Sequence, residues 1–511
     1  MTVNNAAGRE VPLEIFGKTY KPYNGAYGTV PTGRKYGRKY GFLTQNRKIY
    51  DDLEKVIQET GLRNGMTVGF HHCLRYGDYV INMVMDTVAS MGIRNLTLAS
   101  TALFPNHEPL LEHIREGVIT RIEGSMNGPI GKAVSTGEIT IPTTLRSHGG
   151  RARAVECGDL RIDVSFVATP ACDELGNMNG CQGPSAFGAN GFANDTDSIY
   201  ADCVVLVTDN LTEEPVTPVS IKAPNVDYIV TVDRIGDPSK IVAGSLGRKA
   251  PEKHLVIARQ VVEVAEAAGY IRNGLSFQAG AGGVSLAATQ YIHEVMTEKE
   301  IVGSFVHGGT TESAVKLLED GLFRRIYDGQ SFDLVAVKSL RENPAHIEYS
   351  AQNSYNIWTP GGPLASYVDV VALGATEVDV NFNVNVNTHS DGLLLHGIGG
   401  HTDAAAARMT VITCPLARKV PIIIDRVTTV STPGEMIDVV ITDSGIAVNP
   451  RRADLKKKLE KAGLETRDIH DLRDEAYSLA SPLEPDMTDE ICTVVEYRDG
   501  TILDVIRRVK T

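Results

Sequence analysis

The amino-acid sequence contains one long internal repeat. Three landmarks occur twice in the same order in this 511-residue chain, and the second copies follow the first by 208, 204 and 206 residues. Such a period is far too long for a solenoid, so the chain is predicted to consist of two homologous halves. The paired segments are G-L-R-N-G-M-T-V-G-F from Gly61 with G-Y-I-R-N-G-L-S-F-Q from Gly269, R-E-G-V-I-T-R-I from Arg115 with E-D-G-L-F-R-R-I from Glu319, and I-D-V-S-F-V-A from Ile162 with V-D-V-V-A-L-G from Val368.

Each half alternates apolar segments with segments of helical periodicity. In the first half, residues 56–61 end a helix at a glycine, 66–70 form a strand, 79–91 a helix and 95–100 the next strand. This alternation predicts an α/β fold with mainly parallel sheets covered by helices. Ligands of such sheets bind beyond the carboxyl ends of the strands, so functional residues are expected directly after strands.

The chain is also too long for a single hydrophobic core. We expect an N-terminal arm at residues 1–44, a first domain at 45–250 and a second domain at 251–511. The boundary is placed at G-R-K-A-P-E-K, from Gly247 to Lys253, because a new helix is predicted from about His254.

The charge balance excludes one class of partner. Lys and Arg number 50 against 63 Asp and Glu, which gives a net charge of −13. General nucleic-acid binding needs a basic surface, so it is not expected here. One segment, residues 33–48, is basic without any acid. It forms either a solvated arm or a contact for an acidic partner or a phosphate.

The cysteines and the apolar segments indicate the cellular setting. The seven cysteines are an odd number without a C-x-x-C pair, which indicates reduced thiols, not a disulfide framework or a zinc site. The first residues lack an apolar signal core, and no apolar run reaches the ~18 residues of a membrane span. We therefore expect a cytoplasmic protein without a bound metal and without a membrane contact.

A first glycine-rich segment, F-Q-A-G-A-G-G-V-S from Phe277 to Ser285, lies between a predicted strand and a predicted helix. Gly280, Gly282 and Gly283 would present backbone N–H groups to an anion at the start of the helix. A tight turn without a ligand explains the glycines equally well. A dinucleotide site is disfavoured, because the next strand ends at His307 and not at an acidic residue.

A second glycine-rich segment, H-G-I-G-G-H-T-D from His396 to Asp403, precedes a run of alanines. Small residues let a bulky ligand approach the backbone closely. The N–H groups of Gly399 and Gly400 could form an oxyanion hole. Asp403 falls in the first turn of a helix, where a carboxylate also interacts favourably with the helix dipole.

Two basic segments could bind a polycarboxylate. V-G-F-H-H-C-L-R-Y-G-D places His71, His72 and Arg75 after a strand, and R-S-H-G-G-R contributes Arg146 and His148. Arginine and histidine suit carboxylate recognition. Adjacent histidines at the end of a strand do not easily face one ion, so an anion is favoured over a metal. Ordinary surface charge is the alternative.

A polar turn, T-P-A-C-D-E-L-G-N from Thr169 to Asn177, directly follows the strand predicted at 162–168. The Asp, Gly and Asn residues are typical of a well-formed turn. A structural role and a functional role explain it equally well.

Together these segments resemble the CoA-transferase superfamily, and within it the alpha subunits of citrate lyase. The resemblance covers about residues 45–510, and it leaves the first 44 unmatched. The matching motifs are G-M-T-V-G-F-H-H from Gly65, N-M-V-M-D from Asn82, N-L-T-L-A-S from Asn95, S-H-G-G-R from Ser147, C-D-E-L-G-N from Cys172, V-D-R-I-G-D from Val232, Q-S-F-D from Gln330, F-N-V-N-V from Phe382, S-D-G from Ser390 and G-I-A-V-N-P from Gly445.

The resemblance implies two CoA-transferase-like domains and a transfer reaction. An acetyl thioester on the CoA-like arm of an acyl carrier would be exchanged for a citryl thioester, and acetate would be released. A beta subunit would then cleave the citryl thioester, and a gamma subunit would be the acyl carrier. No cofactor would be tightly bound, and the chain would form a homo-oligomer.

The resemblance also suggests roles for the residues singled out above. Gly399, Gly400 and Asp403 would be catalytic. The basic groups His71, His72, Arg75, Arg146 and His148 would bind citrate. The thioester arm would contact Gly280, Gly282, Gly283, Gly397 and His401.

The chain departs from classical CoA transferases at one position. Those enzymes form a covalent acyl intermediate on a glutamate at a strand end, and the matching position here is near Gly308, in V-H-G-G-T-T-E. A carboxylate of citrate would therefore be the nucleophile and would form a mixed anhydride.

Several alternatives remain at this stage. The chain could be a classical CoA transferase that uses Glu312 or Glu377, or the alpha subunit of citramalate lyase, which differs in the acid accepted. A binding module for a small effector is the non-enzymatic alternative.

Overall fold

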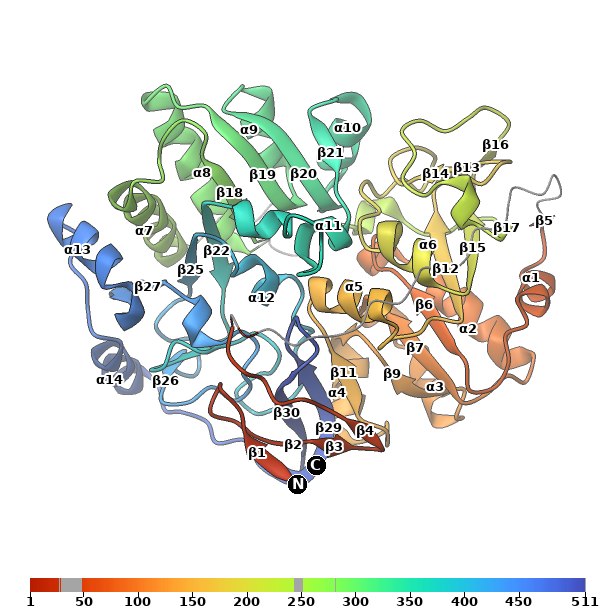
Figure 1. The fold of residues 1–511 in the computed structure, drawn as a ribbon, viewed down its shortest axis with the longest axis horizontal. Helices are drawn as coiled ribbons and strands as arrows, with labels where there is room; N and C mark the ends of the chain where they lie inside the picture. The colour runs from red at the N-terminus through yellow and green to blue at the C-terminus, as the bar shows by residue number, and fades with distance from the viewer. Residues whose placement is uncertain (27, 29–47, 243–250, 281, 511) are drawn as a thin grey trace.

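The computed structural model describes residues 1–26, 28, 48–242, 251–280 and 282–510. Two α/β halves lie side by side, and both termini lie at the lower edge of the molecule (Figure 1). Most of the basic segment 33–48 falls on residues 29–47, outside the described residues. The predicted domain boundary at 247–253 falls partly on residues 243–250, which are also outside them.

The first half is built on a parallel sheet with the strand order β5-β17-β15-β12-β6-β7-β9. Its strands are β5 (Lys48–Tyr50), β6 (Thr67–Phe70), β7 (Leu96–Ser100), β9 (Ile119–Ile122), β12 (Val164–Thr169), β15 (Cys203–Thr208) and β17 (Tyr228–Thr231). Its helices are α1 (Leu53–Thr60), α2 (Val80–Ser90), α3 (Leu110–Arg115), α4 (Gly128–Thr136), α5 (His148–Cys157) and α6 (Ser198–Tyr200).

The second half is built on a sheet with the order β21-β20-β19-β18-β22-β25-β27-β28, in which only β28 is antiparallel to its neighbour. Its strands are β18 (Ser276–Ala279), β19 (Gly303–Thr310), β20 (Phe323–Ser331), β21 (His346–Glu348), β22 (Val370–Gly374), β25 (Met409–Thr413), β27 (Val439–Thr442) and β28 (Gly445–Val448). Its helices are α7 (Glu252–Ala268), α8 (Gly283–Glu298), α9 (Glu312–Glu319), α10 (Leu334–Glu342), α11 (Ala351–Tyr355), α12 (His401–Ala404), α13 (Ala453–Lys461) and α14 (Ile469–Leu479).

The internal repeat of the sequence is a repeat of topology. The order β17-β15-β12-β6-β7-β9 of the first sheet corresponds strand by strand to β27-β25-β22-β18-β19-β20 of the second. Each half also carries a small side sheet after its central strands. These are β14-β13-β16 and β24-β23-β26, with β13 (Ala171–Asp173), β14 (Met178–Asn179), β16 (Leu211–Thr212), β23 (Glu377–Asp379), β24 (Val384–Asn385) and β26 (Ile423–Ile424).

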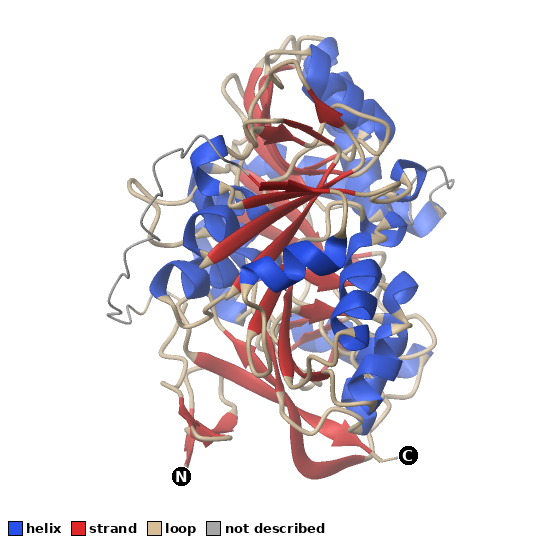
Figure 2. Ribbon diagram, turned by 90° about the vertical axis from the view of Figure 1, so that its right-hand side faces the viewer, coloured by secondary structure: helices blue, strands red, loops and turns tan. Residues whose placement is uncertain are grey.

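Local sequence explains where these elements begin and end. Asp52 accepts a hydrogen bond from the Lys55 N–H at the start of α1, and Gly61 ends that helix with a φ of 69°. Gly269 ends α7 in the same left-handed conformation, with a φ of 89°. All residues of β12 are buried, as expected for a strand of a parallel sheet with helices on both faces (Figure 2).

The C-terminal strands return to the first half of the chain. Strand β29 (Met487–Glu496) pairs antiparallel with β30 (Ile502–Val509) and parallel with β11 (Thr143–Leu145). The N-terminal residues pack against this hairpin through Val11, Ile15 and Tyr20. They form the short strands β1 (Thr2–Asn4), β2 (Glu10–Pro12), β3 (Glu14–Ile15) and β4 (Lys18–Thr19).

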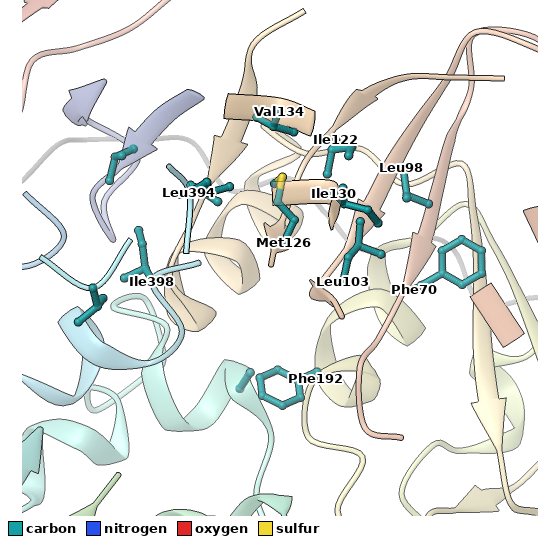
Figure 3. Close-up of a cluster of buried hydrophobic side chains, with 14 of the residues drawn as sticks. Phe70, Leu98, Leu103, Ile122, Met126, Ile130, Val134, Phe192, Leu394 and Ile398 are labelled. Atoms are coloured by element: carbon teal, nitrogen blue, oxygen red, sulfur yellow. The ribbon is translucent and has the colours of Figure 1, made fainter. Parts of the chain in front are cut away.

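One hydrophobic cluster extends across both halves of the chain. Leu394 and Ile398, from the loop before α12, lie beside Met126 and Ile130 of the first half (Figure 3). The Leu394 N–H also donates to Ser135 Oγ at 2.8 Å. This packing anchors the second glycine-rich segment against the first half. None of the described helices is long and apolar enough to cross a membrane.

Candidate active site

A cavity of about 600 Å³ lies at the carboxyl ends of the strands of the second sheet. Gln278 lies in the last part of β18 and Gly280 follows that strand, Gly308 and Gly309 belong to the end of β19, and Thr376 follows β22. His148 and Phe192 of the first half complete the wall. The cavity is therefore where ligands bind in open α/β sheets, and both halves contribute to it.

The first glycine-rich segment lines this cavity at the start of α8. Gly280, Gly282 and Gly283 are all part of the wall, while Ala281 between them lies outside the described residues. A Cβ atom added to Gly282 would meet nothing within 4 Å. Packing therefore does not require a glycine at this position. The glycine leaves open space beside the backbone at the N-terminus of a helix.

The second glycine-rich segment faces the same cavity from the other side. Gly399 and Gly400 line it, and the Gly399 carbonyl accepts a hydrogen bond from the His148 N–H at 2.9 Å. Within the described part of the chain, no acceptor receives the N–H of Gly399 or Gly400. These two N–H groups are therefore available to a ligand. Gly397 does not line the cavity, and a Cβ atom there would overlap Ser125.

Asp403 connects the two motifs that the sequence analysis treated separately. Its carboxylate accepts a hydrogen bond from Ser147 Oγ at 2.9 Å and another from the Gly149 N–H at 2.8 Å. Asp403 is 1% exposed and lies outside the cavity wall, and burial raises its pKa to about 6. Its contacts hold the Gly399–Gly400 loop against the start of α5.

His148 and His401, two of the histidines that line the cavity, are neutral near pH 7. Burial lowers the pKa of His148 to about 3 and that of His401 to about 4. His401 Nε2 donates to the Gly374 carbonyl at 2.9 Å, so its Nδ1 accepts from the Thr432 hydroxyl at 2.7 Å. His401 is thus held by two bonds, and His148 presents an uncharged ring to the cavity.

His71 and His72 lie behind the cavity wall. His71 Nε2 is 3.2 Å from the Ala168 carbonyl oxygen, and His72 Nε2 is 3.2 Å from Gln330 Oε1. The His72 ring stacks on His148 with a centroid distance of 5.9 Å. Burial lowers the pKa of both residues. The contacts of His72 support His148 and Gln330, which do line the cavity.

The two predicted arginines have different surroundings. Arg146 is buried and makes hydrogen bonds to Glu496 at 2.6 and 3.0 Å and to Glu123 at 2.5 Å. Its charge is therefore already paired. Arg75 lies 4.8 Å from the ring of Phe332, which lines the cavity, and no described carboxylate forms an ion pair with it.

The two candidate glutamate nucleophiles lie outside the cavity. Glu312 is exposed at the start of α9, and Glu377 is buried, where it accepts hydrogen bonds from Asn385 and Thr428. No Asp or Glu is among the described residues that line the cavity. Gly308 has a φ of 107°, and a Cβ atom there would lie 3.0 Å from Gln278 Nε2. A side chain at this strand end is thus disfavoured by both conformation and space.

The polar turn after β12 has a structural role that is duplicated. The Asp173 carboxylate accepts from the Asn177 N–H at 2.9 Å and from Asn177 Nδ2 at 3.0 Å. In the second half, Asp379 makes the same two bonds with Asn383, at 3.0 and 3.1 Å. The turn therefore belongs to the repeated framework of each half.

Several residues of the cavity wall carried no recognisable signal in the sequence. Tyr355 lies in S-A-Q-N-S-Y, which matches no binding pattern, and only its place in the fold brings it to the cavity. His254 and Arg418 also line the wall, near Gly283. In the described part of the chain, no group of three or more His, Cys, Asp or Glu residues is arranged to hold a metal ion.

Solved structures with low sequence identity share this arrangement of two α/β halves. A 4-hydroxybutyrate CoA-transferase from Porphyromonas gingivalis has a TM-score of 0.55 over 84% of this chain and 98% of its own, at 14% identity. The predicted fold class is therefore confirmed. The two halves, with a glycine-lined cavity between them, therefore have a CoA-transferase-like fold.

More similar proteins identify the family. Residues 46–509 match the family model of citrate lyase, alpha subunit. The citrate lyase alpha chain of Haemophilus influenzae is 43% identical over 96% of this chain and 98% of its own length. A Streptococcus mutans structure, assigned as the alpha subunit of citrate lyase and in complex with citrate, has a TM-score of 0.95 at 39% identity and covers 99% of this chain and 100% of its own. The chain belongs to the citrate lyase alpha subunit family and is a transferase, as predicted.

Proposed function

We propose that the cavity between the halves is where this transferase exchanges acetyl for citryl on the CoA-like arm of an acyl carrier. The observation that carries the proposal is the pair of N–H groups at Gly399 and Gly400, which face a cavity without a carboxylate side chain among its described residues. Such a site can stabilise an oxyanion but offers no enzyme carboxylate to accept the acyl group.

The chemistry then requires the substrate to provide the nucleophile. A carboxylate oxygen of citrate attacks the carbonyl carbon of the acetyl thioester. The C–S bond then breaks, which releases the thiolate and forms a mixed anhydride of acetate and citrate. The thiolate next attacks the citryl carbonyl of the anhydride, and the C–O bond breaks to release acetate. Both steps develop negative charge on a carbonyl oxygen, which Gly399 and Gly400 would stabilise.

Citrate would approach from the side of Gly308, Gly309 and Phe332. Gly308 and Gly309 line the cavity without side chains, so a substrate carboxylate would reach the strand end where a classical CoA transferase carries its glutamate. Arg75, which stacks on Phe332, is the cation that would pair with citrate. His148 is neutral near pH 7 and would contribute a hydrogen bond without adding charge. A relative at 39% identity is in complex with citrate.

The thioester arm would enter beside the first glycine-rich segment. Gly282 and Gly283 begin α8, and His254 and Arg418 line the cavity next to them. A helix N-terminus with an arginine and a histidine nearby suits the phosphate groups of a CoA-like arm. This arm would be a substrate carried by the gamma subunit, and no tightly bound cofactor is needed.

The proposal includes a multi-subunit complex. The beta subunit would cleave the citryl thioester made here, and the alpha chain itself would be present in several copies. None of the seven cysteines, all of which lie among the described residues, forms a disulfide bond, which fits a cytoplasmic setting.

A transfer assay tests this function. Acetyl-CoA is offered with citrate, citramalate or a simple monocarboxylate, and the acyl-CoA products are identified by mass. We expect citryl-CoA, and initial rates should require both substrates on the enzyme at once. Transfer between monocarboxylates alone would refute the proposal.

A chemical trap tests the absence of an acyl-enzyme. The protein is incubated with acetyl-CoA and then with borohydride, which would reduce a glutamyl thioester to an alcohol and inactivate the enzyme. We expect full activity to survive, as in a sample without acetyl-CoA. Inactivation with a mass change at Glu312 or Glu377 would identify a classical CoA transferase instead.

A further inference from the structure

The hydroxyl of Tyr355 lies beside the backbone of the second glycine-rich segment. Tyr355 ends helix α11 and lines the cavity. A Cβ atom added to Gly400 would lie 3.5 Å from Tyr355 Oη and 3.4 Å from its Cζ. The hydroxyl therefore lies next to the Gly400 backbone, although Tyr355 and Gly400 belong to different elements.

The hydrogen bonds of this hydroxyl leave its proton available. Gln278 Nε2 donates to Tyr355 Oη at 3.2 Å, so the oxygen acts as the acceptor in that contact. No described acceptor receives the Tyr355 O–H. Burial, followed by the negative charge of Asp403, raises the pKa of the hydroxyl, so it remains protonated at any working pH. The oxygen of this buried hydroxyl accepts a hydrogen bond, but its proton is not donated. A ligand in the cavity can supply the missing acceptor.

The surroundings hold the Tyr355 ring in place. Its centroid lies 5.3 Å from that of His307 and 6.3 Å from that of His148. A Cβ atom on Gly149 would overlap the Tyr355 carbonyl oxygen, so the backbones of α5 and α11 are in close contact. The start of α5 thus supports the tyrosine directly and the Gly399–Gly400 loop through Asp403, as oxyanion stabilisation requires.

We propose that Tyr355 is a catalytic residue that donates a third hydrogen bond, beside Gly399 and Gly400, to the carbonyl oxygen under attack. Gln278 is the positioning residue that directs this hydroxyl. The inference rests on the proposed transfer reaction and extends it. The hydroxyl donates in both steps without losing its proton, so no base or co-reactant is required.

The test replaces Tyr355 with phenylalanine, which removes one oxygen atom and keeps the ring. We expect kcat with acetyl-CoA and citrate to fall by ~10²-fold, the usual scale for one oxyanion donor. The KM values of both substrates should stay within about twofold, because the bond strengthens mainly in the transition state. A purely structural role would instead lower the thermal midpoint or raise KM.

Tyr349→Phe is the matched control. Tyr349 lies on another side of His307, with a centroid distance of 6.4 Å, and is not among the described residues that line the cavity. Its kcat should equal that of the wild type. A Tyr355→Phe variant with wild-type kcat would overturn the inference.

The role of Gln278 is tested by a double-mutant cycle. Gln278→Leu should lower kcat in the wild-type background and have little further effect in the Tyr355→Phe background, since both changes remove one interaction. Fully additive losses would contradict the positioning role, and this comparison remains valid if one single variant is less stable.

A wild-type protein that makes no citryl-CoA would reject the proposed function, whereas wild-type transfer with an unaffected Tyr355→Phe would reject only this inference.

Discussion

At the scale of single residues, the glycines around the cavity have different physical reasons to be glycine. Gly149 and Gly397 have no room for a side chain, because a neighbouring backbone or side chain would overlap a Cβ atom. Gly308 combines a positive φ with a close neighbour, while Gly282 has open space around it. Close packing explains the first kind, and ligand access explains the last.

Gly400 tests the oxyanion role directly. Its φ of −91° suits any residue, and a Cβ atom would be in ordinary contact with His148 and Tyr355 at 3.4 Å. Gly400→Val should therefore fold but fill the space beside the N–H groups, and kcat should fall by ~10²-fold or more. Steady-state rates and a thermal unfolding curve measure both effects.

Gly400→Ala is the graded control for this change. It adds only the Cβ atom at contact distance and should fall between the wild type and the valine variant. An unchanged rate in a well-folded Gly400→Val variant would exclude this loop from the reaction.

Arg75 tests citrate recognition. Arg75→Ala removes a cation that no described carboxylate neutralises and that stacks on the cavity residue Phe332. The KM for citrate should rise by ~10-fold, which corresponds to about 1.4 kcal/mol, while the KM for acetyl-CoA stays the same. Kinetics with each substrate varied in turn measure the difference.

Arg234→Ala is the matched control, because Arg234 also lies over an aromatic ring, that of Tyr79 at 5.9 Å. Unlike Phe332, Tyr79 is not among the described residues that line the cavity. The citrate KM of Arg234→Ala should not change. Equal effects of the two variants would place the citrate site elsewhere.

At the scale of secondary-structure elements, the two halves repeat their hydrogen bonds as well as their strands. The Asp163 carboxylate accepts from the Thr67 N–H between β12 and β6, as Asp369 does from the Ser276 N–H between β22 and β18. The Asp–Asn turns after these strands repeat too. Such side-chain bonds to backbone groups terminate the strands, so they persist in both copies.

Helices α12 and α5 are joined by Asp403, which gives the enzyme an expected pH dependence. With a pKa of about 6, the carboxylate is ionised above that pH and accepts from Ser147 and Gly149. Protonation below pH 6 weakens these bonds and loosens the Gly399–Gly400 loop. We expect kcat to fall by ~10-fold between pH 7 and pH 5, as for one group that must be ionised.

Asp403→Asn should have a lower kcat, and its kcat should no longer fall between pH 7 and pH 5. Citrate titrates in the same range, so the two proteins are compared at equal pH, where the substrate contributes equally. If kcat of the variant still fell between pH 7 and pH 5, another group would be responsible for the pH dependence.

The contact between β11 and the C-terminal hairpin depends on a buried charge cluster. Arg146 pairs with Glu123 and Glu496, and although burial alone would raise the pKa of Glu496, Arg146 lowers it to about 2. Arg146→Ala would remove the cation that joins these two buried carboxylates, and it would leave Glu123 with Arg121 alone and Glu496 with Lys18 and the more distant Arg153. It should reduce the free energy of unfolding by up to about 3–5 kcal/mol.

Arg161→Ala is the matched control, because the Arg161–Asp202 pair is largely exposed and should contribute less than about 1 kcal/mol. Urea denaturation measures both losses. Equal stability of the two variants would contradict the structural role of Arg146.

At the scale of the whole molecule, many buried histidines are neutral in the folded state. Burial lowers the pKa of His148 to about 3 and the pKa values of His307 and His401 to about 4. The unfolded chain binds these protons near pH 6.5, so the folded state holds fewer protons between pH 6.5 and 4. Their contribution to stability is complete above pH 6.5 and is lost as the pH falls toward 4.

We therefore expect the thermal midpoint to fall between pH 7.5 and pH 5. Each histidine changes the free energy of unfolding by about 1.4 kcal/mol per pH unit. The raised pKa of Asp403 has the opposite effect on stability, but it offsets the effect of only one of the three histidines. His307→Gln should weaken this pH dependence, whereas His470→Gln, at an exposed position, should leave it unchanged. A pH-independent midpoint would contradict the neutral state of these histidines.

The sequence by itself determined the two homologous α/β halves and the glycine segments that line the cavity. These features are local, since helix ends at Gly61 and Gly269, the buried strands and the repeated motifs depend on neighbours along the chain. It also identified the family, because motifs along residues 45–510 resemble those of citrate lyase alpha subunits, and the family model matches residues 46–509.

Only the tertiary structure decided which polar residues meet. Asp403 contacts Ser147 and Gly149 across the two halves, Arg146 is paired with Glu123 and Glu496, and Tyr355 lies beside Gly400. Such contacts join residues tens to hundreds of positions apart, and no spacing pattern in the chain encodes them. The physical reason is that burial and hydrogen bonding depend on the three-dimensional neighbours of a side chain, and those neighbours exist only once both halves have packed together.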